Sequence, residues 1–159
     1  MGRRILTLMA MATVVLLAAC SSGPVRRISE PAASIQELAV QADGSWMVSL
    51  RLQNYSSIPM RFEAVDINIT IGGEAAGALQ HRPGLEIGPE SADVVSVAMQ
   101  PGSSARMVIA DALAAGRRVD YAFDGTIDAA PSDRGASRSY KVERKSALSP
   151  TPGLPGVMR

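Results

Sequence analysis

The chain of 159 residues carries 16 basic and 15 acidic side chains, and its formal net charge at pH 7 is +1. Outside the first residues no long run of one sign occurs, which argues against nucleic acid as a partner, because phosphate binding needs a concentrated basic patch. A hydrophobic content of 47% is enough for a packed core and excludes disorder of the whole chain. Without its apolar start, the chain has the length of one domain.

The first residues have the layout of an export signal. Arg3 and Arg4 form a short positive region, and residues 5–19 that follow carry no charge. An apolar run of about fifteen residues is shorter than the roughly twenty needed to cross a bilayer as a permanent helix. Residues 1–19 therefore predict a signal peptide that is removed after export.

The end of this apolar run resembles the lipobox of bacterial lipoproteins. Leu17, Ala18 and Ala19 precede Cys20, the only cysteine of the chain. The resemblance implies that the Cys20 thiol receives a diacylglycerol group, that cleavage makes Cys20 the first residue, and that fatty acyl chains of the palmitate type hold the protein to a membrane. Ser21, where an aspartate would signal retention, resembles lipoproteins passed to the outer membrane. The implied location is the cell envelope, facing the periplasm; an ordinary secretory signal or an uncleaved anchor helix is the alternative.

Composition divides the remainder of the chain. Residues 20–33 are small and polar with two prolines and predict a lipidated flexible tether, whereas residues 34–146 predict one domain. Three prolines and two glycines in residues 149–156 predict a disordered tail over 147–159. A single cysteine forms no intramolecular disulfide, so packing alone must stabilise the domain.

Period-two alternation of apolar and polar residues dominates residues 34–146 and is typical of half-buried strands. It is clearest over residues 46–53. Asp43 and Gly44 predict a hairpin turn between this strand and an earlier one over 35–40, since glycine tolerates the positive φ of such turns.

The apolar phase changes within residues 60–71, which predicts a long strand with a β-bulge near Glu63 and Ala64. Gly72 and Gly73 then predict the turn at which that strand ends. A short return strand is predicted after this turn.

A short helix is predicted over residues 105–115, with Ser103 or Ser104 as its N-cap and Gly116 as its terminator. Further strands are predicted at residues 75–79, 94–99, 119–124 and 140–145. A loop that contains His81 is predicted between the first two of them. About seven short strands predict an all-β fold, a single antiparallel β-sandwich of the immunoglobulin or fibronectin-III type with one short helix.

Several of these pieces, in this order, resemble the type 2 late-embryogenesis-abundant (LEA) or water-stress and hypersensitive-response (WHy) domain. The resemblance rests on the strand at 46–53 leading into Asn54, on Pro59 before the long apolar strand, and on the turn at residues 87–89. It covers roughly residues 35–142, although members commonly show Asn-Pro-Asn where this chain keeps the first asparagine alone. The resemblance implies a fibronectin-III-like sandwich, a link to desiccation stress and no known catalytic residue.

Few residues of the chain suit metal binding or catalysis. His81 is the only histidine and Cys20 is assigned to lipid, so neither a Cys/His metal cluster nor a Cys/His dyad can form. We therefore expect no metal, no cofactor and no catalytic residue. A hydrolase that uses His81 with Glu90 or Asp93 is the weakest hypothesis, because no serine occupies a strand-to-helix elbow.

Two groups of carboxylates could supply oxygen ligands to calcium. One comprises Glu86, Glu90 and Asp93, and the other comprises Asp120, Asp124 and Asp128. The second group lies on the outward face of a predicted strand, where water contact alone accounts for alternating charge. We expect both groups to be solvated.

Two hypotheses for function follow. The leading one is a membrane-anchored, non-catalytic sandwich that faces the periplasm and protects envelope or protein surfaces during water stress. The alternative is a structural or assembly subunit that docks onto an envelope complex through an exposed edge of the sandwich. Both have the membrane as a partner, through lipid on Cys20.

Overall fold

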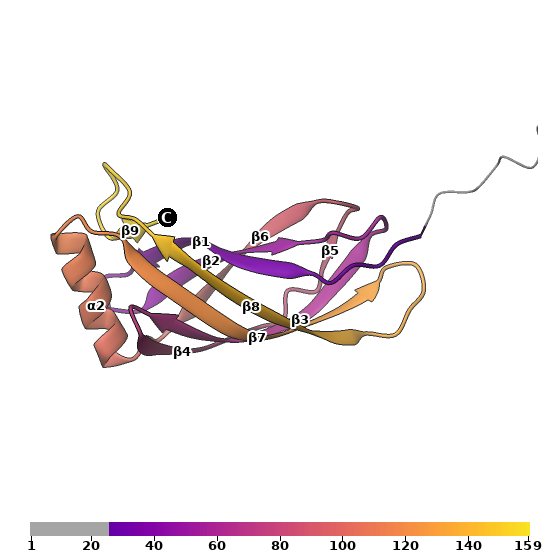
Figure 1. Ribbon diagram of the computed structural model, residues 1–159, viewed down its shortest axis with the longest axis horizontal. Coiled ribbons are helices and arrows are strands. Elements are labelled where there is room, and N and C mark those ends of the chain that lie inside the picture. The colour runs from indigo at the N-terminus through magenta and orange to yellow at the C-terminus, as the bar shows by residue number, and fades with distance from the viewer. Residues whose placement is uncertain (1–25) are drawn as a thin grey trace, which may run out of the picture.

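Strands with alternating buried and exposed side chains make up most of residues 26–159, the part of the chain that the computed structural model describes. They form two antiparallel sheets that face each other (Figure 1), one with the order β6-β2-β1-β9 and the other with the order β4-β3-β7-β8, with β5 paired to β3. The elements are β1 (Ala32–Val40), β2 (Trp46–Gln53), β3 (Met60–Ile71), β4 (Glu74–His81), β5 (Leu85–Ile87), β6 (Ala92–Met99), α2 (Ser103–Ala114), β7 (Val119–Pro131), β8 (Arg138–Leu148) and β9 (Val157–Met158). The prediction of an antiparallel β-sandwich with one short helix is confirmed.

The predicted hairpin between the first two strands is present. β1 and β2 pair antiparallel up to Val40 and Trp46, and Gly44 in the connecting turn has a φ of +82°. Asp43 Oδ1 accepts hydrogen bonds from the backbone N–H and the hydroxyl of Ser45, at 2.9 and 2.6 Å, which closes the turn.

The predicted bulge and turn of the long strand are also present. The register between β3 and β7 shifts between Phe62 and Ala64, and β3 otherwise pairs with β7 over its whole length. Ile71 pairs with Glu74 across the turn at Gly72 and Gly73, so that β4 runs back along β3.

The core lies between the two sheets. Trp46 and Phe62 are the largest of its fully buried side chains, and α2 adds Ala105, Ile109 and Ala112 at one end. Fully burying each large apolar side chain contributes about 1.5–3 kcal/mol, so the sandwich can be stable without a disulfide.

The predicted N-cap of the helix is wrong. Gly102 occupies that position, and no side chain caps the helix. A Cβ at Gly102 would lie 2.8 Å from the carbonyl oxygen of Ala75, so close contact with β4 selects glycine there. The predicted terminator is correct, since Gly116 has a φ of +62° and follows the last turn.

The predicted disordered tail is wrong as well. β8 continues to Leu148, and residues 149–156 turn back so that β9 pairs with β1. Met158 is fully buried, and Ser149 and Arg159 exchange two backbone hydrogen bonds. The prolines and glycines therefore form the turns between two paired segments and do not mark loss of structure.

The predicted tether is partly wrong, because its second half lies against the domain. Ser29 N–H donates to Ser56 Oγ at 3.0 Å, Arg27 N–H donates to Ser57 Oγ at 2.9 Å, and β1 already begins at Ala32. The described residues do not include the lipobox (Leu17, Ala18, Ala19), Cys20 or the rest of the tether up to residue 25. Lipidation therefore stays a prediction.

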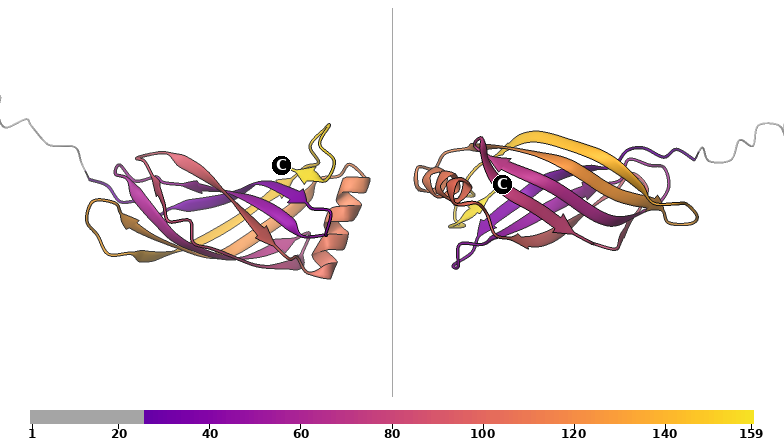
Figure 2. Two further views of the ribbon diagram at one scale, coloured as in Figure 1. Left: turned by 180° about the vertical axis from the view of Figure 1, so that it is seen from behind. Right: turned by 90° about the horizontal axis from the view of Figure 1, so that it is seen from below.

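The sandwich has two different ends. Helix α2, the β1–β2 turn and the C-terminal residues gather at one end, and the described chain starts at the opposite end (Figures 1 and 2). Within residues 26–159, no helix has the length and hydropathy needed to cross a membrane.

Candidate binding surfaces

Asn54, a residue on which the resemblance to the WHy family rests, is buried and holds two loops together. It is 1% exposed, and its side-chain N–H groups donate to the carbonyl oxygens of Ile58, Ile87 and Gly88 at 2.8–3.0 Å. Its Oδ1 accepts a hydrogen bond from Ser56 N–H at 2.8 Å. One side chain thus joins the loop after β2 to the loop after β5.

Pro59, the second motif residue, is exposed and lies immediately before β3. Its carbonyl oxygen accepts a hydrogen bond from Ser132 N–H at 3.1 Å, just beyond β7. Both motif residues therefore fix loops at the end where the described chain begins.

An ion pair fastens the start of the described chain at this end. The guanidinium of Arg26 donates to both carboxylate oxygens of Asp133, at 2.7 and 3.0 Å. This hydrogen bond, together with the N–H of Arg134, lowers the pKa of Asp133 below its ordinary value. Arg27 pairs with Glu90 at 3.0 Å beside it. Both pairs are exposed, so each contributes little to stability, but together they orient the chain.

The residues considered for catalysis or metal binding are spread out. His81 ends strand β4 and does not lie in a loop as predicted, beside an open hollow of about 410 Å³ that also touches Asp66, Gln80 and Arg82. Glu90 is engaged by Arg27, and Asp93 accepts a hydrogen bond from the next backbone N–H. Across residues 26–159, His, Cys, Asp and Glu side chains form no group of three or more that could hold a metal ion.

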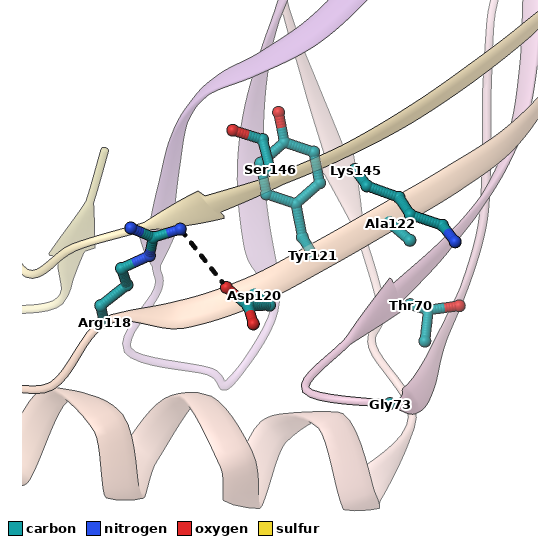
Figure 3. A pocket seen from close by; sticks show the side chains of 8 residues that line it. All are labelled: Thr70, Gly73, Arg118, Asp120, Tyr121, Ala122, Lys145 and Ser146. Atoms are coloured by element: carbon teal, nitrogen blue, oxygen red, sulfur yellow. Dashed lines mark ion pairs between the residues drawn. The ribbon is translucent and has the colours of Figure 1, made fainter.

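The outer face of the sheet formed by β4, β3, β7 and β8 is densely charged. Asp120 and Asp124 are exposed there as predicted, and Asp128 is half-buried. A shallow hollow of about 410 Å³ lies on this face near α2 (Figure 3), where Arg118 pairs with Asp120 at 3.6 Å. We name this surface the charged face; its charged residues are Arg61, Glu63, Asp66, Asp120, Asp124, Asp128, Lys141, Glu143 and Lys145.

The outer face of the other sheet is nearly free of charge, and we name it the neutral face. Glu37 and Arg51 are its charged residues on β1, β2 and β6, and Arg159 pairs with Glu37 at 2.6 Å. The remaining side chains are small or uncharged: Ala32, Ser34, Ala39, Met47, Ser49, Gln53, Ala92, Val94, Ser96 and Ala98. The two sheets of the sandwich thus present opposite chemistry to their surroundings.

Strand β6 borders the neutral face and forms the edge of its sheet. Asp93 is its only charged residue, and Val94 is 39% exposed. Natural edge strands are commonly protected by lysine, proline or a bulge. Strand β6 has no lysine or proline, and its register with β2 is regular over its whole length.

Neither face was recognised from the sequence. Taken within one strand, none of the residues Met47, Ser49 and Ser96 indicates a binding surface. Pairing of Ser49 with Ser96 and of Met47 with Ala98 brings distant segments together, and the lack of charge then extends over three strands. Low charge at the outward positions of residues 46–53 and 92–98 was the available signal.

Comparison with known proteins gives similarity of fold only. No family model and no curated protein sequence matches the chain. A solved structure provisionally assigned to the LEA proteins is 13% identical, with 95% of this chain and 86% of that chain covered and a TM-score of 0.49. A protein of Arabidopsis thaliana is 12% identical over 80% and 83% of the two chains, with a TM-score of 0.48. A protein of Archaeoglobus fulgidus is 12% identical over 79% and 98%, with a TM-score of 0.42.

One of these structures is the one provisionally assigned to the LEA proteins. At such low identity and TM-scores below 0.5 they carry no information on ligands or partners. The surfaces of this chain therefore have to supply the functional argument.

Proposed function

We propose that this chain is a lipid-anchored, non-catalytic module of the cell envelope that covers protein or membrane surfaces through its neutral face during water loss. The observation that carries the proposal is the unequal charge of the two outer faces. A strongly charged face keeps the module hydrated and soluble, whereas a face made mostly of alanine and serine, with two charged residues, loses less hydration when another surface covers it.

The chemistry of the neutral face suits weak, unselective contact. Most of its side chains are alanine, serine or valine, and covering these costs little conformational entropy. Ser49 and Ser96 already share a hydrogen bond at 3.2 Å, which reduces their need for water. Such a surface can associate with many partners as they dry and release them when water returns.

Anchoring is the second part of the proposal. Cys20 carries the lipid, on the resemblance of Leu17, Ala18 and Ala19 to a lipobox, and places the domain in the periplasm at the outer membrane. Mass spectrometry of the mature protein should find Cys20 as first residue with acyl chains attached. The Cys20→Ser chain should lack that mass and leave the membrane fraction. A bare Cys20 thiol in the wild-type protein would contradict the anchor.

Charge placed on the neutral face should abolish protection. We expect the wild-type protein to reduce aggregation of a client enzyme during drying and rehydration, measured by light scattering. Ser96→Lys should lose most of that effect, because a lysine ammonium must be dehydrated when a client covers it.

Asn68→Lys is the matched control, since it adds the same charge to the exposed charged face, opposite Asp124. It should protect as well as the wild-type protein. Equal protection by both variants would exclude the neutral face, and no protection by the wild-type protein would exclude the stress role.

A second candidate function is an assembly subunit that docks through an edge of the sandwich. The regular, lysine-free edge strand β6 favours it, because a partner strand could extend the sheet there by main-chain hydrogen bonds. Crosslinking in intact cells from a photoreactive residue at Val94 distinguishes the two functions. One dominant stoichiometric product supports an assembly subunit, and many minor products support general protection.

A further inference from the structure

An apolar hollow lies at the end of the sandwich where α2 packs. Its volume is about 320 Å³, and its walls are Val40, Gly44, Trp46, Arg106, Ile109, Ala110, Leu113 and Gly156. These residues come from β1, its turn to β2, the start of β2, the helix and the C-terminal segment. A volume near 300 Å³ is at the lower end of the range of natural ligand pockets.

A second hollow of about 360 Å³ adjoins the first. Leu113 and Gly156 line both hollows, and the other residues that line the second are Pro150, Thr151, Gly153, Leu154 and Pro155. The two hollows together lie between the helix and the C-terminal segment and are called the groove below. Because the hollows share Leu113 and Gly156, an alkyl chain that fills the first can continue into the second.

Arg106 is the only charged side chain that lines the first hollow. Within residues 26–159 it takes part in no ion pair, whereas the nearby Arg117 pairs with Asp111. A Cβ on Gly44 would lie 3.2 Å from a guanidinium nitrogen of Arg106, so the cation lies over the β1–β2 turn. The carboxylate of Asp43 in that turn is held by Ser45, which leaves the guanidinium available to an anion.

The helix presents a regular stripe to this hollow. Arg106, Ala110 and Leu113 have the spacing i, i+4 and i+7, which places them on one side of α2. Trp46 also lines the hollow and is 1% exposed. The Arg106 cation therefore borders an otherwise apolar space.

We propose that this groove binds a single-chain anionic amphiphile, a fatty carboxylate, with the carboxylate at Arg106 and the alkyl chain along Ile109 and Leu113. Apolar walls select the chain, and the unpaired guanidinium selects the anion. The groove shares no residue with the neutral face, so this binding is independent of the proposed protective function.

Trp46 is the only tryptophan of the chain, so its fluorescence reports occupation of the hollow directly. Dodecanoate, kept below its critical micelle concentration, is titrated into residues 21–159, which contain both sheets and the helix. We expect a saturable change in Trp46 emission. Dodecanol, which has the same chain without the charge, should bind at least tenfold more weakly.

Arg106→Gln should weaken dodecanoate binding about tenfold and leave dodecanol binding unchanged. The matched control is Arg117→Gln, which removes the same charge from the same end of the domain but not from the hollow; it should bind like the wild-type protein. Ala110→Phe, at an exposed helix position that lines the hollow, should block both ligands while the melting temperature stays the same.

Three results would overturn the proposal. They are a Trp46 signal that does not saturate, equal affinity of the wild-type and Arg106→Gln proteins for dodecanoate, and equal affinity of the wild-type protein for dodecanoate and dodecanol. The last result would show an apolar patch without selection for an anion.

Discussion

Asn54 shows how one buried amide can decide the stability of a loop region. Its side chain makes hydrogen bonds with three carbonyl oxygens and one N–H group, and it is 1% exposed. Asn54→Ala leaves these groups buried without partners, and we expect a loss of about 3 kcal/mol in the free energy of unfolding. Urea denaturation measures it, with the exposed Asn68→Ala as control, expected within about 0.5 kcal/mol of the wild-type protein. Equal midpoints for the two variants would contradict this role.

Gly125 is a position at which the neighbouring backbone leaves no room for a side chain. A Cβ there would lie 2.1 Å from the carbonyl oxygen of Asp66 on β3, in the middle of the β3–β7 pairing. We expect Gly125→Ala to cost about 3 kcal/mol or more, because neither backbone can move without breaking the ladder. Gly88→Ala is the control, since its nearest neighbour would be Ser91 Oγ at 3.7 Å. Comparable thermal melting of both variants would show that β7 can shift.

The short C-terminal strand β9 helps to stabilise the whole sandwich. β9 pairs with β1 through Leu38 and Ala39, and Met158 is fully buried. Met158→Ala removes that side chain from the core and should lower the free energy of unfolding by about 2–4 kcal/mol. Leu154→Ala, in the same segment but 47% exposed, should change it by less than about 1 kcal/mol. A Met158→Ala protein as stable as the wild type would support the disordered tail predicted from composition.

Strands β2, β3 and β7 were predictable because their alternation is local, and even the bulge at Phe62 to Ala64 appears as a change of phase. The two short strands β5 and β9 were not predictable, since β5 falls within the predicted loop and β9 within the predicted tail. β9 has two residues, and its partner Leu38 lies far away in the sequence. Prolines and glycines around it also give the same signal in an ordered turn as in a disordered tail.

The candidate surfaces were less accessible to sequence reasoning than the fold. The neutral face exists only through the register of β6 against β2, and the groove brings Trp46 together with Arg106 and Gly156. Each of these residues has an ordinary local explanation. Charge could be counted along a strand, but its distribution between two faces depends on which strands become neighbours.

If Cys20 is lipidated, the two ends of the domain lie at different distances from the membrane. Arg26 is fixed to the domain by Asp133, and the six residue steps from Cys20 to Arg26 span at most about 20 Å. If Cys20 is lipidated, the end that contains Asn54 and Tyr55 stays within that reach of the lipid surface. Helix α2 lies at the opposite end of the sandwich from the start of the described chain (Figures 1 and 2), so the groove beside it would lie farther from the lipid.

This arrangement predicts a difference in contact with the membrane between two exposed positions. A fluorophore is attached to a cysteine in each of two variants, Tyr55→Cys and Met107→Cys. Tyr55 is 52% exposed and lies near the start of the described chain, and Met107 is 73% exposed and lies on α2. In vesicles that contain a quencher on the lipid head group, the label at position 55 should be quenched more strongly than the label at 107. Without the lipid, in Cys20→Ser protein, neither label should be quenched. Equal quenching of both labels in the lipidated protein would mean that the domain lies flat on the membrane, and the groove would then draw its ligand directly from that surface.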